Sequence, residues 1–395
     1  MLLSPSNRLV VIDLARGFAL LGVALVNVHA FAAAWSSVYG LDLAASATDV
    51  VAEYTVAMLF THRSYPVLAF LFGVGLAWQW QRLPDTGRAA NRLRPRLWAL
   101  LLIGLSHGLL LWPGDVLTTY AVMGLVIVAM VNAGDRAMLR TTMAVYALTA
   151  CFYLGLGALG LHWAAAASAV NEPASSFAQT TWRAALALHR GEYLERGLVQ
   201  LLVPDFWAHT LLGLWAGRSG ALRQFLDAAY APQRQRINRI GALLFFAGTT
   251  VEIIAAHYGG WNVRSFDDFG VALMTLAVLP ASVGGLWLWL TVARAWSQRG
   301  DCLLRSWVVA AGRAPLSQFV GQSIVFSLLF NKSLVGLHGE LGRAAYSLIA
   351  LATYVLLCAF IRAWLASGHA HGPMEILWRQ LTKLLSPQPS SGSIT

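Results

Sequence analysis

Residues 101–120 read LLIGLSHGLLLWPGDVLTTY, and this stretch decides the fold of the chain. Two apolar runs flank the tripeptide WPG, in which Pro113 and Gly114 break a helix and let the chain reverse direction. The stretch therefore predicts the end of one membrane helix, a tight turn and the start of another. It also carries His107 and Asp115, two ionisable residues that are costly near lipid.

The composition extends this interpretation to the whole chain. Of the 395 residues, 57% are hydrophobic and 12% are charged, with a mean hydropathy of +0.60. These values leave too little polar surface for a soluble domain, so the predicted fold class is all-α, a polytopic integral membrane protein. The net charge of +10 does not indicate nucleic-acid binding, because the arginines lie mostly in short loops. The three cysteines lack paired spacing, so neither a disulfide framework nor a metal site is expected.

About ten apolar runs are long enough to cross a membrane, which puts both termini on the same side. Of the 28 Lys and Arg residues, 20 fall in one set of loops and ends and 6 in the other, while Arg63 and Arg313 lie within spans. Because positive loops are typical of the cytoplasmic side, both termini are predicted to be cytoplasmic. The predicted spans are 9–31, 55–80, 96–112, 116–131, 141–164, 199–217, 238–258, 269–293, 307–329 and 344–366.

A change of character near residues 218–238 divides the chain. This basic stretch predicts a cytoplasmic linker between a six-helix unit, residues 1–217, and a four-helix unit, residues 239–385. The outer connection at 165–200 contains apolar residues at helical spacing among charges, which indicates a helix along the membrane surface. Residues 386–395 are predicted to be a disordered tail.

Polar residues near the outer ends of the first four spans are expected to lie at one depth. An ionisable residue within a span is by default a functional-site hypothesis. The layer consists of Asn27, His29, His62, Arg63, His107 and Asp115.

His107 and Asp115 are the leading candidates for a reaction centre. A carboxylate at the turn can hold one imidazole nitrogen and leave the other as a general base for acyl transfer. The alternative is structural: a hydrogen bond that ties two helix ends together, with Asp115 as a helix cap.

Arg63 must meet an anion, a carbonyl or water within its span. It is predicted either to pair with Asp115 or Glu53, or to hold a substrate oxyanion, a role for which Asn27 is the alternative. His209 and Glu252 extend the same cluster or are satisfied residues of the bundle core.

A basic rim is expected around the inner ends of the first three spans. It contains Arg16, Arg92, Arg94 and Arg96, from LARG at 14–17 and GRAANRLRPR at 87–96. Positive-inside topology explains such a rim, and a docking surface for a phosphorylated donor such as coenzyme A is the functional alternative. Gly73 and Gly75 are expected to be close-packing positions.

Several segments resemble the YeiB-like bacterial membrane proteins, which carry a C-terminal domain of unknown function. These segments are VIDLARGFALLGVALVNVHAF at 11–31, LAFLFGVGLAWQWQR at 68–82, RLWALLLIGLSHGLLLWPGDVLTTYAVMGL at 96–125, GRAPLSQFVGQS at 312–323 and HGPMEILWRQLT at 371–382. The family is grouped with transmembrane acyltransferases, among them the lysosomal heparan glucosaminide N-acetyltransferase. The resemblance implies about ten helices in the inner membrane of a bacterium, a cytoplasmic acyl-CoA donor and an acceptor modified at the outer face.

The resemblance also assigns roles to residues. The shared pattern D-x-x-R-G-x-A, here beginning at Asp13 and containing Arg16, resembles a donor-side element. His107 and Asp115 match the family element HGLLLWPGD.

The leading hypothesis is therefore an enzyme that moves an acyl group, such as acetyl, from acyl-CoA to a hydroxyl or amine of a small molecule or glycan. A transporter or exporter of a small polar or amphipathic molecule is the alternative, and a membrane scaffold is a third reading. The expected surroundings are membrane lipid, without nucleic acid, and a homodimer is possible.

Overall fold

The computed structural model describes residues 5–33, 46–83, 89–158, 175–257 and 268–386, and within these ranges the chain is helical without strands. Apolar runs interrupted by Pro, Gly and short polar turns produce helices rather than sheets because, in lipid, a helix satisfies its own backbone polar groups. The helices are α1 (Pro5–Ala32), α2 (Ala47–Leu59), α3 (Ser64–Gln81), α4 (Ala89–Leu110), α5 (Leu117–Ile127), α6 (Asp135–Ala158), α8 (Trp182–Glu192), α9 (Pro204–Ser219), α10 (Ala221–Leu226), α11 (Ala231–His257), α12 (Asp268–Ser297), α13 (Leu303–Arg313), α14 (Pro315–Phe330), α15 (Arg343–Ala366) and α16 (Pro373–Leu385).

The multi-pass membrane architecture follows from the longest of these helices. Five are long and apolar enough to cross a membrane, and a sixth crossing results if the bent pair Trp182–Leu202 and Pro204–Ser219 is one span. Leu117–Met130 and Pro315–Phe330 are apolar but shorter. The described residues thus form an all-helical membrane protein, while ten crossings and the side of the termini stay predictions.

Two predicted spans are broken. The span at 55–80 is divided by a turn at residues 60–63, where His62 has a positive φ of 56°, a conformation uncommon for residues other than glycine. The span at 307–329 is interrupted at Ala314, with φ −126° and ψ 60°. The reason is local: Pro315 follows, and a residue before proline is disfavoured in the helical region.

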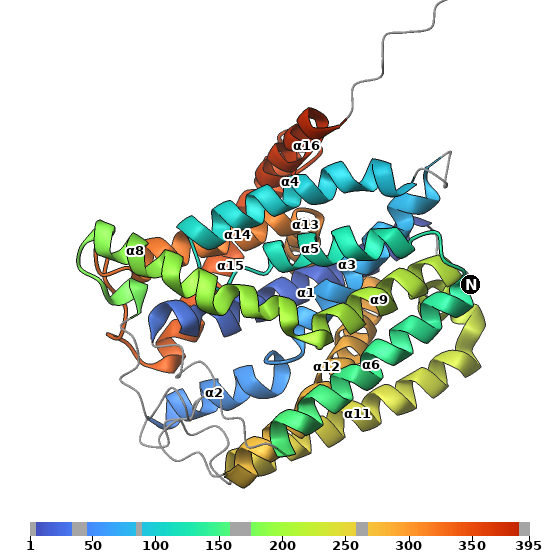
Figure 1. The fold of residues 1–395 in the computed structure, drawn as a ribbon, viewed down its shortest axis with the longest axis horizontal. Coiled ribbons are helices and arrows are strands. Elements are labelled where there is room, and N and C mark those ends of the chain that lie inside the picture. The colour runs from blue at the N-terminus through green and yellow to red at the C-terminus, as the bar shows by residue number, and fades with distance from the viewer. Residues whose placement is uncertain (1–4, 34–45, 84–88, 159–174, 258–267, 387–395) are drawn as a thin grey trace, which may run out of the picture.

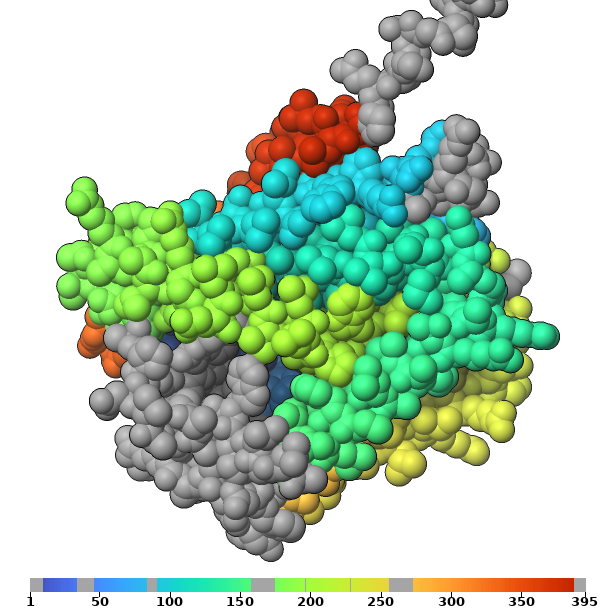
Figure 2. Space-filling view, in the orientation of Figure 1, coloured from blue at the N-terminus to red at the C-terminus, as the bar shows by residue number. Residues whose placement is uncertain are grey.

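Helix α1 lies near the middle of the bundle, with α4 and α16 at one edge and α6 and α11 at the opposite edge (Figure 1). It packs against α3 and α12 through α15, so helices of the predicted N-terminal and C-terminal units share one interior. The red α16 forms a ridge beside the cyan α4 in the space-filling view (Figure 2).

The contact between α3 and α9 depends on glycine. A Cβ on Gly73 would lie 2.0 Å from the carbonyl oxygen of Thr210, and a Cβ on Gly213 would lie 1.9 Å from that of Phe70. Gly73 is therefore a close-packing position, as is typical of membrane helices. The same prediction is wrong for Gly75, since a Cβ there would have nothing within 4 Å.

Part of the surface-helix prediction is outside the described residues, as are residues 387–395 of the tail. In the described part of the outer connection, α8 begins at Trp182 and the chain continues in π and 3-10 turns to Leu202. Pro204 then starts α9, five residues later than the predicted start of that span at 199.

Candidate functional site

The structure brings His107 and Asp115 together and adds a third residue, Ser323. His107 is near the end of α4, Asp115 follows the WPG turn, and Ser323 lies in the middle of α14. The Nδ1 atom of His107 lies 2.8 Å from Oδ1 of Asp115, and Nε2 lies 2.9 Å from Oγ of Ser323. All three are buried, with exposed fractions of 2%, 1% and 3% respectively. Serine, histidine and aspartate thus follow one another in a single line of hydrogen bonds.

Asp115 also holds the start of α5. Its Oδ1 accepts from the backbone N–H of Leu117 at 3.0 Å, and its Oδ2 accepts from that of Thr118 at 2.8 Å. A carboxylate is well placed there, because the first N–H groups of a helix lack partners and carry partial positive charge. The two roles considered for Asp115, helix cap and histidine partner, are therefore both present in the same geometry.

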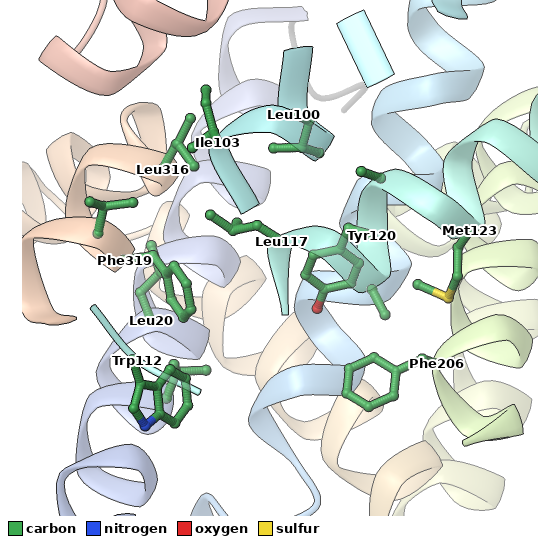
Figure 3. Packing of buried hydrophobic residues seen from close by; sticks show 14 of the residues in the cluster. Leu20, Leu100, Ile103, Trp112, Leu117, Tyr120, Met123, Phe206, Leu316 and Phe319 are labelled. Atoms are coloured by element: carbon green, nitrogen blue, oxygen red, sulfur yellow. The ribbon is translucent and has the colours of Figure 1, made fainter. Parts of the chain in front are cut away.

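Aromatic rings enclose the histidine. The ring centroid of His107 lies 5.1 Å from that of Phe319 and 6.4 Å from that of Trp112. Figure 3 shows Trp112 and Phe319 near each other, and their ring centroids lie 6.3 Å apart. The indole Nε1 of Trp112 is buried and has no hydrogen-bond partner among the described residues. A hydrogen-bond donor is thus free beside the histidine.

A cavity of about 300 Å³ leads toward this group. On α1 it is lined by Arg16 and then, one helical turn inward, by Leu20; on α4 Arg96 is likewise followed by Leu100. Polar groups therefore lie at one end of the cavity and apolar side chains at the other. Several of the apolar side chains are labelled in Figure 3. The lining residues are Arg16, Leu20, Leu68, Leu71, Phe72, Gly75, Gln79, Arg96, Leu100, Val116, Leu117, Tyr120, Arg313, Pro315, Leu316, Phe319, Glu375 and Trp378.

The polar end of the cavity carries an excess of positive charge. Arg16 lies 3.4 Å from Asp13. The Arg96 guanidinium lies 4.5 Å from the ring centroid of Trp378 and its Nε has no hydrogen-bond partner in the described part of the chain. Arg313 is exposed, and no carboxylate of the described residues forms an ion pair with it.

The imidazole of His371 is affected by the same excess of positive charge. Burial, together with the positive charges of Arg379, Arg313 and Arg96, lowers the pKa of its imidazole below the ordinary value. Such a group of cations suits a phosphorylated ligand.

The predicted basic rim is only partly a cavity wall. Arg16 and Arg96 line the cavity, whereas Arg92 and Arg94 are exposed on α4 and are not among its lining residues. Arg94 instead lies 3.4 Å from the side-chain oxygen of Asn91. Positive-inside topology is sufficient to explain these two exposed arginines.

Arg63 pairs with neither of its predicted partners. Its NH2 group lies 2.6 Å from Oε2 of Glu252 on α11, and both side chains are fully buried. Glu53 is instead paired with Arg343, at 2.6 Å. An arginine buried in a membrane helix needs a carboxylate, and α11 supplies one that is 189 residues away in sequence. His62 lies at the same place, 3.4 Å from Glu252.

The remaining candidates of the predicted layer lie elsewhere. His29 packs edge-on against Tyr346, with ring centroids 6.3 Å apart, and Asn27 is half-buried on α1. His209 lies 3.0 Å from Asp205, which also accepts hydrogen bonds from Tyr65 and Ser282. No contact found between described residues joins these groups to His107.

Sequence reasoning missed Ser323, Arg313, Glu375 and Trp378. A serine in an apolar helix carries no distinctive signal, and the partner of Ser323 is 216 residues away. The segments GRAPLSQFVGQS and HGPMEILWRQLT contained all four, so the resemblance was the only available indication.

Comparison with known proteins extends along nearly the whole chain. Residues 216–384 match a family model described as "Protein of unknown function (DUF418)". The chain is 26% identical to "Uncharacterized protein YxaH" of Bacillus subtilis (strain 168), covering 97% of this chain and 96% of that protein. It is 25% identical to "Uncharacterized protein YeiB" of Escherichia coli (strain K12), covering 95% and 96%. These similarities confirm the resemblance to YeiB-like proteins that was found in the sequence.

Proposed function

We propose that this protein is a membrane-embedded acyltransferase that takes an acyl group from acyl-CoA on the cytoplasmic side. The acceptor is a hydroxyl or amine, of a small molecule or glycan, at the outer face. The observation that carries the proposal is the cavity, which begins at Arg16, Arg96 and Arg313 and reaches Phe319, whose ring packs against His107.

The two ends of the cavity fit the two ends of such a donor. Phosphate groups bind well to guanidinium groups, whose planar donors can contact two oxygens at once. The acyl arm is uncharged and suits walls formed by Leu20, Leu100 and Leu117. Arg96 and His107 are eleven positions apart on α4, or about 16 Å at the helical rise. A donor held by its phosphates at the rim would point its thioester toward the histidine.

The buried line of hydrogen bonds supports acyl-transfer chemistry. Asp115 accepts the Nδ1 proton of His107, which fixes the tautomer and leaves Nε2 as a base. The free indole N–H of Trp112 is available to a developing oxyanion. This replaces the oxyanion role expected for Arg63, whose guanidinium is occupied by Glu252.

The same proposal includes the topology. Ten crossings of the inner membrane, with both termini in the cytoplasm, put the arginine end of the cavity on the side where acyl-CoA is made. The charge distribution of the loops supports this arrangement. A reporter enzyme active only outside the cytoplasm, fused after residue 386, should be inactive, and activity there would contradict the orientation.

Calorimetric titration of the purified protein with acetyl-CoA tests the donor site. The Arg96→Ala/Arg313→Ala variant should bind at least tenfold more weakly, because hydrogen bonds to charged groups contribute about 1.5–3 kcal/mol each. Arg92→Ala/Arg94→Ala is the matched control: it removes equal charge outside the cavity and should bind as the wild type does.

Two results would overturn this function. One is the absence of both acetyl-CoA binding and thiol release with any cell extract. The other is solute flux through proteoliposomes that needs no acyl donor, which would favour a transporter.

A further inference from the structure

The base of the proposed reaction already has a partner. Nε2 of His107, the nitrogen that would remove a proton from an acceptor, lies 2.9 Å from the hydroxyl of Ser323. Because Nδ1 donates its proton to Asp115, Nε2 is an acceptor and the serine must donate to it. Any acceptor molecule would first have to displace this hydroxyl from a site that is closed to solvent.

We infer that Ser323 is the nucleophile, and that the acyl group passes through an ester on its Oγ before it reaches the acceptor. This inference rests on the proposed function and specifies its path. Nucleophile, base and orienting carboxylate within hydrogen-bond reach are the geometric signature of covalent catalysis. Here α4, α14 and the turn between α4 and α5 supply them.

The atoms balance over two half-reactions. Oγ of Ser323 attacks the thioester carbonyl as His107 takes its proton. The carbon–sulfur bond breaks, the proton passes to sulfur, and coenzyme A leaves as the thiol. In the second half, His107 takes a proton from the acceptor hydroxyl or amine, which attacks the ester carbonyl. The serine oxygen leaves and recovers the proton, so neither oxidant nor reductant is required.

Neighbouring residues support this position for the nucleophile. Phe319, one turn before Ser323 on α14, lines the cavity and packs against His107, so the cavity ends one helical turn from the serine. Trp112 contacts both rings and holds an unpartnered indole N–H. Such an apolar enclosure would exclude water and protect the ester from hydrolysis.

Ser327 shows what a purely structural serine looks like on the same helix. It lies one turn after Ser323, is half-buried, and donates to the carbonyl oxygen of Leu111 at 2.9 Å. Ser323 also lies 3.3 Å from the carbonyl oxygen of Phe319, but its single proton cannot serve both acceptors. The imidazole is the nearer acceptor.

The decisive experiment needs no acceptor. Wild-type protein mixed with acetyl-CoA alone should release one thiol per protein in a rapid burst, and mass spectrometry should find acetyl on the peptide that contains Ser323. Ser323→Ala should abolish both signals while its acetyl-CoA affinity and melting temperature stay within the range of the wild type. Ser327→Ala, the matched control, should keep the burst and the adduct.

The outcomes separate this inference from the function on which it rests. If Ser323→Ala keeps the transfer rate of the wild type while His107→Ala loses it, the acyl group moves directly and the inference is wrong, although the function stands. An acetyl group found on His107 or elsewhere would also overturn it. If the wild type neither binds acetyl-CoA nor releases thiol, the function itself fails.

Discussion

The carboxylate of Asp115 binds both the imidazole of His107 and the backbone N–H groups at the start of α5. A single substitution can separate these two roles. In Asp115→Asn, the amide oxygen can still accept from the backbone N–H of Thr118, so α5 keeps one of its two capping bonds, while the amide NH2 takes the place of the oxygen that faces Leu117 and His107. The negative charge that stabilises an imidazolium is lost, and the preferred tautomer is no longer enforced. Thiol release should fall by about 10⁴-fold, the effect of the equivalent change in a serine–histidine–aspartate triad. The melting temperature should change little.

Asp115→Ala serves as the comparison at this position. It removes the cap as well, which costs about 1 kcal/mol of stability. If Asp115→Asn retained full activity while Asp115→Ala lost stability, Asp115 would be a structural cap alone. Rate and melting temperature measured on the same preparations decide between these interpretations.

At the scale of the helix, α3 presents two glycines to different surroundings. Gly75 lines the cavity with open space around it, whereas Gly73 touches the backbone of α9. Gly75→Leu should therefore fill the cavity and weaken acetyl-CoA binding at least tenfold without loss of stability. Gly73→Ala should destabilise the protein by about 1–3 kcal/mol, the usual cost of overpacking. Unchanged affinity in Gly75→Leu would show that the donor does not use this cavity.

The ion pair between Arg63 and Glu252 joins the start of α3 to α11. Arg63→Met leaves a buried carboxylate without its arginine and should cost about 3–5 kcal/mol. The double variant Arg63→Met/Glu252→Leu should recover much of that loss, because no uncompensated charge remains. Thermal unfolding in detergent measures both. Recovery should be incomplete, since Arg63 also donates to the carbonyl oxygens of Ala57 and Thr61.

Helix α16 is attached to α14 through Glu375, and the attachment should depend on pH. The carboxylate accepts from the backbone of Leu316 and Ser317 and from the Ser317 hydroxyl. Burial outweighs these bonds and raises the pKa of Glu375 above its ordinary value of 4.5. The folded state therefore favours the protonated acid. Its stabilising contribution is complete below pH 4.5 and is lost as the pH rises through the folded pKa.

A pH series on two proteins isolates this contribution. Glu375→Gln keeps an oxygen acceptor but cannot titrate. The melting temperature of the wild type should fall relative to that of Glu375→Gln as the pH rises from 4.5 toward neutrality. A difference that stays constant across the series would contradict the assignment.

For the molecule as a whole, predictions from sequence succeeded where neighbours in the chain determine the outcome. The helical membrane architecture follows from apolar run lengths. The meeting of His107 with Asp115 follows from their separation of only eight residues across one turn. Arg16 and Arg96 could be assigned to the basic rim because their charges lie at the ends of apolar runs.

Contacts between distant segments could not be predicted in this way. The pairing of Arg63 with Glu252 and of His107 with Ser323 depends on which helices become neighbours, and apolar periodicity does not encode that choice. A common predicted depth in the membrane was therefore not enough to place these polar residues in one site. The residues of the predicted polar layer belong to separate helix contacts. The two broken spans depend on local backbone preferences that hydropathy does not register.

The two predicted units provide a test at this scale. Residues 218–395 expressed alone should release no thiol from acetyl-CoA, because this part lacks both His107 and Asp115. Co-expression with residues 1–217 should restore release if the helices reassemble around α1. Activity of the C-terminal part by itself would contradict the site.

The hydrogen bond between α4 and α14 has a consequence for how relatives are compared. The matched family region, 216–384, includes the serine but excludes the histidine and the aspartate. A relative identified by that region alone has been checked for the hydroxyl and not for the groups that would activate it. Sorting the family into reactive and unreactive members therefore requires reading positions 107, 115 and 323 jointly, across the boundary at which that region begins.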